Sequence, residues 1–318
     1  MCIDNLPHLG TSMMSRNDPS VLSIARRVGT LGAISLLMAG CVSAGAGESP
    51  IPSPSPSTPA SPSASAAPSG PSSAGGFYLR AWQTQALAPQ YTFTWLPVAT
   101  ISDGEFIDGM VAVPAIYPGP LWVGLNAQPI NADGIAAIVA EARKDGLLGS
   151  TSDFTATPMA GAVTAHIQMV VDGKTYELVG DPDALTRCRC IPDPGTSGAF
   201  AEFWQKLTGL AMWLPDELGQ SSPYEPTSLA VLAMPATEAT SGITPQEVAW
   251  PLATPFSRFG TAMGNDSYRC AVVTGADLAA LEPVVKQANQ LTRFVDDAKV
   301  KDSLLVRVMV PGEPGPCA

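Results

Sequence analysis

Alternating hydrophobic and polar residues predict an antiparallel hairpin in the middle of the chain. Every second residue of 163–171 is apolar, and mostly polar residues stand between them. Asp172-Gly173 follows, a pair that favours a two-residue hairpin turn, and the alternation resumes over 175–178. Such a turn fixes the register, so one face of the hairpin is buried and the other faces water. The predicted opposite pairs are Met169 with Tyr176 and Ile167 with Leu178.

A second hairpin is predicted earlier in the chain. Aromatic residues alternate with threonine over 91–95, and Ser102-Asp103-Gly104 supplies a turn before the run 105–113. This pattern predicts strands on both sides of the turn.

Two segments have the spacing of amphipathic helices. Asn131 can cap the first, which Gly146 can terminate. The second begins at Thr274, with Asp277 at the spacing of a capping box, and Pro283 is expected to kink or split it. The apolar positions are Ile135, Ile138, Val139 and Ala142 in the first, and Leu278, Leu281, Val285 and Ala288 in the second.

A weaker helix is predicted over 197–208, with Phe200, Phe203 and Leu207 on its buried side. The closing run 304–310 is apolar on both faces apart from its one arginine, which is typical of an inner strand.

The predicted fold class is α+β, with mainly antiparallel sheet and two or three helices. Asp-Gly turns require antiparallel hairpins, which excludes the parallel sheet that alternating strands and helices usually form. We expect the folded region to span 77–318, with a subdomain boundary near the Gly/Ser/Pro-rich stretch 219–226.

Charge and composition exclude some classes of protein. Only 14% of the residues are charged, and 28 acidic against 17 basic side chains give a net charge of −11. Without a Lys- or Arg-rich run the chain cannot neutralise phosphates, so nucleic acid is not expected as a partner. The two histidines leave little room for metal or acid–base chemistry based on imidazole.

The N-terminal region has the layout of a secretory signal. Arg26 and Arg27 precede a mostly apolar run over 28–40, which is too short to span a membrane. The run ends in Leu37-Met38-Ala39-Gly40-Cys41, which resembles the lipobox of bacterial lipoproteins, with Met38 where the family usually has Leu. The resemblance implies that Cys41 is lipidated and that residues 1–40 are removed. The alternatives are an ordinary signal peptide and twin-arginine export.

Residues 41–76 are expected to form the lipidated root and a disordered tether. Of the 27 residues in 49–75, 8 are Pro and 10 are Ser, and none is charged. Such a segment cannot bury enough apolar surface to offset its ordering entropy. The tether would hold the folded region at the extracytoplasmic face of the cell membrane. Residues 1–25 are polar and unpatterned, which suggests a later translation start.

Four cysteines remain once those of the signal and the lipid site are set aside. An even number in an exported protein indicates two disulfides. Cys270, on an expected strand, is favoured as the partner of Cys317, which would otherwise end a frayed tail. Cys188 and Cys190 would then pair in a tight ring, as a structural clip or as a redox site.

No complete catalytic set is evident. His166 is the only histidine left after processing, and the segment 195–199 nearly matches a nucleophile elbow around Ser197 but ends in Ala. The two residues come in the opposite order to that of the elbow fold, so Ser197 is better explained as a helix N-cap. Carboxylates gather at Asp103, Glu105 and Asp108, and at Asp181, Asp183 and Asp193. Solvated turns explain both groups better than a calcium or glycosidase site, so no catalytic residue, metal or cofactor is predicted.

The six tryptophans are expected mainly to pack in the core. Trp122 is the candidate exception because it stands beside Tyr117-Pro118-Gly119-Pro120. This rigid turn could present Tyr117 and Trp122 to a ligand as an aromatic pair.

As a whole, the chain resembles lipoproteins of high-GC Gram-positive and related bacteria, a group without an established activity. The resemblance rests on the lipobox, the Ser/Pro tether, the turn at 117–120, the ending 307–313 and the cysteine near the C-terminus. The resemblance implies a location at the cell membrane, and it identifies no catalytic residue. The leading hypothesis is a membrane-anchored, non-catalytic domain that binds or scaffolds an envelope ligand. The alternatives are an envelope hydrolase that uses carboxylates and a redox module at Cys188 and Cys190.

Overall fold

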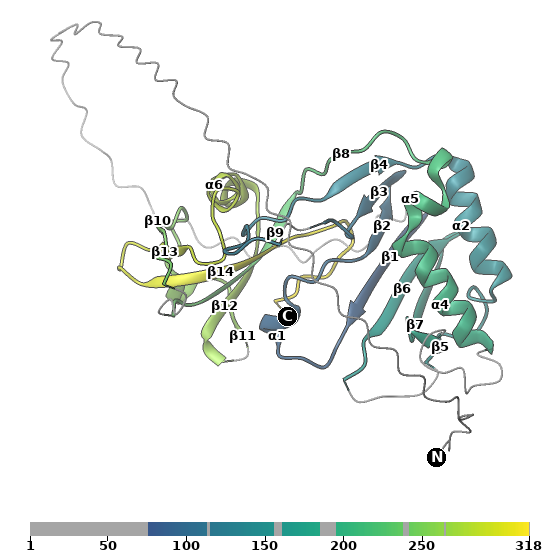
Figure 1. The fold of residues 1–318 in the computed structure, drawn as a ribbon, viewed down its shortest axis with the longest axis horizontal. Coiled ribbons are helices and arrows are strands. Elements are labelled where there is room, and N and C mark those ends of the chain that lie inside the picture. Colours follow the sequence, from purple (N-terminus) through teal and green to yellow (C-terminus); the bar gives the residue numbers. More distant parts are fainter. Residues whose placement is uncertain are drawn as a thin grey trace, which may run out of the picture. The chain divides into compact units, whose positions relative to one another are not determined.

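The computed structural model describes residues 76–112, 115–155, 161–184, 195–237, 242–263 and 265–317. It confirms the α+β class, because two mixed, mostly antiparallel sheets combine with three helices of more than ten residues (Figure 1). Within these residues, no helix has the length and apolar character needed to cross a membrane.

The first sheet has eight strands in the order β5-β7-β6-β1-β2-β3-β4-β8. Its neighbouring strands are antiparallel except β5 and β7. The strands are β1 (Tyr78–Thr84), β2 (Ala99–Ser102), β3 (Glu105–Asp108), β4 (Asn126–Pro129), β5 (Asp153–Phe154), β6 (Thr164–Val171), β7 (Lys174–Gly180) and β8 (Ser222–Pro223).

The central hairpin, β6 and β7, has the predicted turn and register. Asp172 and Gly173 both adopt positive φ, as a two-residue turn of this type requires. Met169 lies opposite Tyr176, and Ile167 lies opposite Leu178. The alternation of apolar residues therefore places one face of the hairpin in the core.

The second hairpin has the predicted turn but a different first strand. Asp103 and Gly104, both with positive φ, connect β2 to β3. Residues 91–95 do not form a strand, because the chain starts a short helix, α1 (Pro89–Thr92), with proline in its first turn. Of the three aromatic residues there, only Phe93 is fully buried, and it packs against the second sheet. The aromatic alternation over 91–95 is therefore not a sign of a strand. It places one residue, Phe93, against the second sheet.

Helices cover one face of the first sheet (Figure 1). They are α2 (Ala132–Lys144), α4 (Gly195–Thr208), the short α5 (Leu210–Trp213) and the 3-10 turn η1 (Pro215–Glu217). Asn131 caps α2 as expected, since its side chain accepts a hydrogen bond from the Gly134 amide at 2.8 Å. Ser197 lies inside α4, so its assignment as the N-cap was wrong. The helices bury Ile138, Val139, Ala142, Phe200, Phe203, Trp204 and Leu207 against the sheet.

The second sheet has six strands in the order β10-β13-β14-β9-β12-β11, with β10 and β13 parallel. β14 lies between β13 and β9, which confirms it as an inner strand. The strands are β9 (Ser228–Pro235), β10 (Glu247–Ala249), β11 (Thr261–Met263), β12 (Asn265–Thr274), β13 (Arg293–Val295) and β14 (Lys301–Val308), with a 3-10 turn, η2 (Phe256–Arg258), between β10 and β11.

One helix, α6 (Gly275–Val285), covers one face of the second sheet. Pro283 does not split it, because the helix continues through this proline and ends two residues later, at Val285. Thr274 precedes the helix but makes no side-chain capping bond, so the capping box is not formed.

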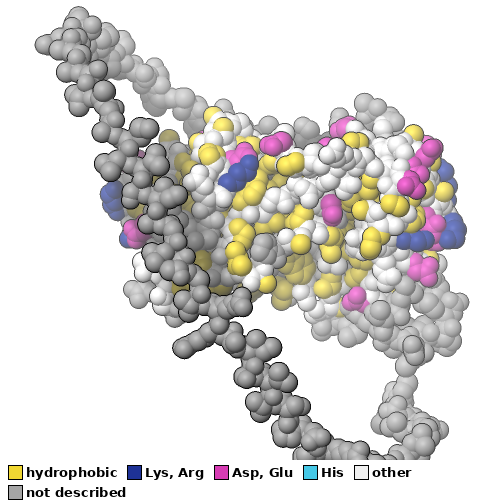
Figure 2. Space-filling view, turned by 45° about the horizontal axis from the view of Figure 1, so that its top comes forward, with side chains coloured by type: hydrophobic (Ala, Val, Ile, Leu, Met, Phe, Trp, Pro, Cys, Tyr) yellow, Lys and Arg dark blue, Asp and Glu magenta, His cyan; other side chains and the backbone are white. Residues whose placement is uncertain are grey.

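Both sheets contribute to one hydrophobic cluster. Ile107 and Ala127 of the first sheet join Val231 and Val306 of the second, together with residues of α6. Charged side chains are sparse over much of the face shown in Figure 2, in keeping with the low charged fraction of the chain. The opposite face of the second sheet is covered by Phe93 and the C-terminal tail.

Candidate functional site

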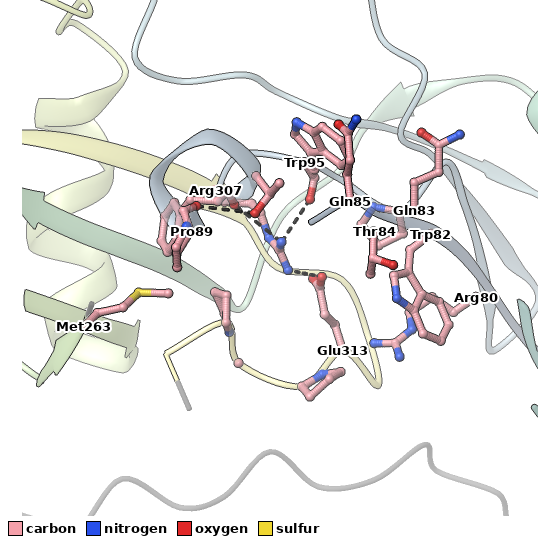
Figure 3. Close-up of a pocket in the computed structure, with 16 residues that line it drawn as sticks. Arg80, Trp82, Gln83, Thr84, Gln85, Pro89, Trp95, Met263, Arg307 and Glu313 are labelled. Atoms are coloured by element: carbon pink, nitrogen blue, oxygen red, sulfur yellow. Dashed lines mark hydrogen bonds and ion pairs between the residues drawn. The ribbon is translucent and has the colours of Figure 1, made fainter. Parts of the chain in front are cut away.

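A pocket of about 360 Å³ lies where strand β1 meets the C-terminal tail (Figure 3). Its walls come from β1, the segment that contains α1, strand β14 and tail residues 313–316. The lining therefore combines residues more than 200 positions apart in the sequence.

Strand β1 supplies the aromatic and cationic wall of this pocket. Leu79 and Ala81 face the helices, so Arg80, Trp82 and Thr84 project from the face without helices. Arg80 is only 6% exposed, and its guanidinium carbon lies 4.1 Å from the centre of the Trp82 ring. We call these two residues, together with His166, the β1 stack.

His166 completes the β1 stack from the neighbouring strand. It lies directly across from Trp82 in the register of β1 and β6. Their ring centroids are 5.1 Å apart, and the planes are inclined by 12°, which is a stacked geometry. Burial, and secondarily the charge of Arg80, lowers the pKa of His166, so both effects favour the neutral imidazole.

Arg80 is a buried cation with few partners. Its sole hydrogen bond is from Nη1 to the Gly312 carbonyl at 3.5 Å, and its buried Nε has no partner within the described residues. No carboxylate of that part of the chain lies within 4.0 Å of its nitrogens. Figure 3 shows the guanidinium between the Trp82 ring and the side chain of Glu313.

A second arginine in the pocket has more partners than Arg80, although its Nε also lacks a hydrogen-bond partner among the described residues. Arg307 and Glu313 form a buried ion pair, with side chains 10% and 6% exposed. Arg307 Nη1 also donates to the carbonyls of Trp95 at 2.9 Å and Phe93 at 3.4 Å. Burial raises the pKa of Glu313, whereas Arg307 opposes this rise. Two guanidinium groups thus share the pocket with one carboxylate, which leaves one excess positive charge.

Thr84, which lines the pocket, forms part of a catalytic arrangement with His166 behind it. Thr84 Oγ1 lies 2.8 Å from His166 Nε2, which is hydrogen-bond distance for a nucleophile and a base. In the described chain, however, no carboxylate hydrogen-bonds to the other ring nitrogen to orient the imidazole. Glu313, the one carboxylate among the lining residues, is occupied by Arg307. Thr84 and His166 therefore form a pair for which the described residues supply no third, orienting member.

The nucleophile elbow considered from the sequence does not assemble. Ser197 lies in α4, which packs on the helix-covered face of the first sheet, whereas His166 projects from the other face. The sheet therefore separates the two side chains.

Most carboxylates near the predicted turns accept hydrogen bonds within those turns. Asp108 accepts a hydrogen bond from the Met110 amide, and Asp181 accepts one from the Asp183 amide. Asp103 accepts from the Ser102 hydroxyl, and Glu105 is exposed at the same turn. Across the described ranges, no three His, Cys, Asp or Glu side chains are grouped to hold a metal ion. Asp193, Cys188, Cys190 and Cys41 lie outside the described residues.

Tyr117 and Trp122 lie away from the pocket lining. Tyr117 is 63% exposed and precedes a cis peptide bond to Pro118. Trp122 is half-buried, with the Lys286 ammonium 4.9 Å from its ring centre. The two rings make no contact with each other in the described chain.

Of the six tryptophans, Trp204 and Trp250 are buried, and Trp82, Trp95, Trp122 and Trp213 are half-buried.

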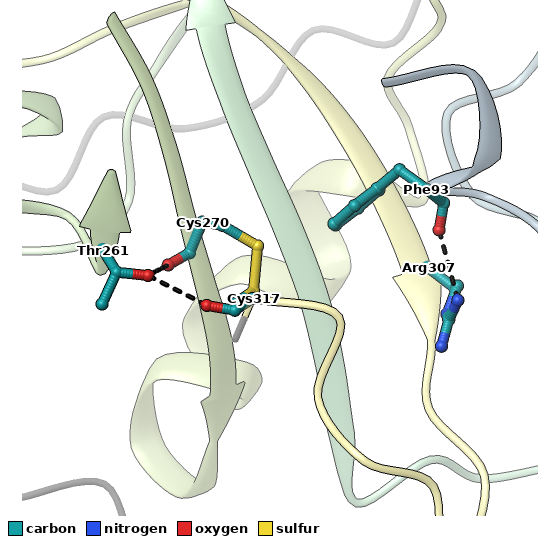
Figure 4. Close-up of a disulfide and its surroundings, with 5 residues drawn as sticks. All are labelled: Phe93, Thr261, Cys270, Arg307 and Cys317. Atoms are coloured by element: carbon teal, nitrogen blue, oxygen red, sulfur yellow. Dashed lines mark hydrogen bonds between the residues drawn. A yellow bond between two sulfur atoms is a disulfide. The ribbon is translucent and has the colours of Figure 1, made fainter. Parts of the chain in front are cut away.

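The structure contains the favoured disulfide between Cys270 and Cys317 (Figure 4). It attaches the C-terminal tail to strand β12, and the Thr261 hydroxyl donates to the Cys317 carbonyl at 3.1 Å. Pro314, Gly315 and Pro316, directly before this disulfide, form one wall of the pocket. The disulfide therefore anchors part of the candidate site.

The sequence alone did not identify Arg80 or Trp82 as site residues. The available signal was a charged residue among the apolar and aromatic residues of β1, and Arg307 gave the same signal in the apolar strand β14. Neither signal indicates that the two arginines approach one pocket, because that depends on tertiary structure.

No protein-family model, curated protein or solved structure matches this chain. The residues of the pocket therefore carry the functional assignment.

Proposed function

We propose that this protein is a membrane-anchored, extracytoplasmic lipoprotein whose folded region binds an envelope ligand without transforming it. The observation that carries the binding role is the β1 stack, in which a poorly partnered arginine and the Trp82 ring line a pocket and His166 stacks on that ring. Aromatic walls with a few polar groups are typical of ligand sites. The described residues place no orienting acid beside His166, which favours binding over catalysis.

The anchor in this proposal depends on Cys41. We expect cells grown with a clickable palmitate analogue to label the protein, because the lipobox-like segment presents this thiol for acylation. Cys41→Ser should abolish the label, and Cys2→Ser should leave it unchanged. Equal labelling of both variants, or a mature peptide that spans Gly40 and Cys41 in mass spectrometry, would contradict the anchor.

The binding role is tested at Trp82. A ligand-observed NMR screen of neutral and charged aromatic fragments should find binders to the purified protein. Trp82→Ala should weaken them about tenfold or more, because an aromatic contact within a pocket is lost. Trp122→Ala removes a half-buried tryptophan outside the pocket and serves as the matched control. If every fragment binds both variants equally, the pocket is not the ligand site.

A further inference from the structure

We infer that the pocket recognises the carboxylate of a monoanionic ligand, with Arg80 holding the carboxylate and Trp82 contacting the adjoining flat group. This inference rests on the proposed binding function and specifies the chemical class of the ligand.

Arg80 carries the inference because its surroundings do not satisfy it. Buried charges in proteins are normally paired and hydrogen-bonded, since removing a charge from water is costly. Arg80 is 6% exposed, yet among the described residues it has a single hydrogen bond, at 3.5 Å, and no carboxylate within 4.0 Å of its nitrogens. Its Nε, like that of Arg307, has no hydrogen-bond partner there. A guanidinium presents planar, paired N–H donors that match the two oxygens of a carboxylate.

Glu313 does not fill this role for Arg80. One of its oxygens accepts from Arg307, and the other accepts from the Val310 amide at 3.3 Å. These two bonds fix the carboxylate toward Arg307. The charge of Glu313 also acts on Arg80, but the two side chains form no direct ion pair, so the N–H donors of Arg80 remain available to a ligand carboxylate.

The charge balance of the pocket favours a monoanion. Arg80, Arg307 and Glu313 together leave one positive charge, which a single carboxylate neutralises. A phosphate dianion would exceed that charge and would lie near the buried Glu313, where like charges repel. The net charge of −11 on the chain adds a general repulsion against highly charged anions.

The remaining walls indicate what is attached to the carboxylate. Trp82 offers the part of its ring that Arg80 and His166 leave uncovered, and Pro89, Pro314 and Pro316 supply rigid apolar surface. Flat apolar groups bury well against such walls. A small aromatic acid and the carboxyl end of a chain with an aromatic side group share this chemistry.

Isothermal titration calorimetry with benzoate tests the assignment. Benzamide is its neutral counterpart of similar shape, so a difference between the two reports the charge. We expect benzoate to bind at least about tenfold more tightly than benzamide, because hydrogen bonds to charged groups are the stronger ones. Arg80→Gln should remove this difference. Arg143→Gln makes the same change at an exposed arginine, whose side chain is 58% exposed, and should preserve it.

Two further measurements keep the test decisive. Arg80→Lys, checked by circular dichroism alongside Arg80→Gln, keeps the charge without the planar fork and should retain only part of the preference, even if Arg80→Gln does not fold. N-acetylphenylalanine distinguishes the two sources of the carboxylate: tighter binding than benzoate indicates a chain end, and weaker binding indicates a free aromatic acid.

The outcomes separate this inference from the proposed function. If benzamide binds as tightly as benzoate and Trp82→Ala weakens both, the pocket is a binding site but the carboxylate assignment is wrong. Tighter binding of phenyl phosphate than of benzoate would overturn the monoanion. If no fragment, charged or neutral, depends on Trp82, the proposed binding role itself fails.

Discussion

One buried carboxylate in the second sheet makes stability depend on pH. Asp302 on β14 is 5% exposed and interacts with the charge of Asp296, which is 4% exposed. Burial, followed by repulsion from Asp296, raises the pKa of Asp302 from 3.8 to about 6. Between these two values the folded chain binds a proton that the unfolded chain releases. The contribution to folding is therefore complete below pH 3.8 and is lost as the pH rises through about 6.

Asp302→Asn should stabilise the protein at pH 7, because the amide cannot become a buried charge. We expect a gain of about 1 to 2 kcal/mol in the free energy of unfolding at pH 7 and little gain at pH 4. Urea denaturation at both pH values measures this gain in the free energy of unfolding. Asp297→Asn makes the same change at an exposed residue, directly after Asp296, and is the control. An equal effect of Asp302→Asn at both pH values would show that the substitution acts through packing alone.

Secondary structure elements with strong local signals could be predicted from the sequence. The Asp172-Gly173 turn fixed the register of β6 and β7, and the Asn131 cap set the start of α2. Both depend on residues within a few positions of each other. The segment 91–95 was predicted wrongly because the burial of Phe93 depends on the second sheet, and alternation alone does not distinguish that contact from a strand.

The pocket could not be predicted from the sequence, because it depends even more on contacts between distant residues. Arg80 and Glu313 are more than 230 positions apart, and no local pattern brings them together. What the sequence did indicate was the cost of each charge in an apolar strand, at Arg80 and at Arg307. Such charges mark positions where a partner or a ligand is needed, but the partner becomes visible only once the sheets are assembled.

On the scale of the whole molecule, the pocket depends on contacts between the two sheets. The Tyr78 hydroxyl on β1 donates to the Pro311 carbonyl at 3.1 Å, and Arg307 on β14 donates to the backbone before β2. Hydrophobic residues of both sheets also share one cluster. The C-terminal tail closes this arrangement, and the disulfide fixes the end of the tail. The geometry of the site should therefore respond to a change at the distant Cys317.

Cys317→Ser should both destabilise the protein and weaken the pocket. The bond joins residues 47 positions apart, and closing a loop of this size is worth about 4 kcal/mol on the chain-entropy model. Because Pro314 and Pro316 lose their anchor, the affinity for benzoate should also fall. Urea denaturation and calorimetry measure the two effects. Reduced wild-type protein should behave like the variant, and Arg143→Gln should affect neither property. Unchanged benzoate affinity in a folded Cys317→Ser protein would mean that the tail holds its position without the disulfide, through its other contacts, such as the Arg307–Glu313 ion pair and the Tyr78 hydrogen bond.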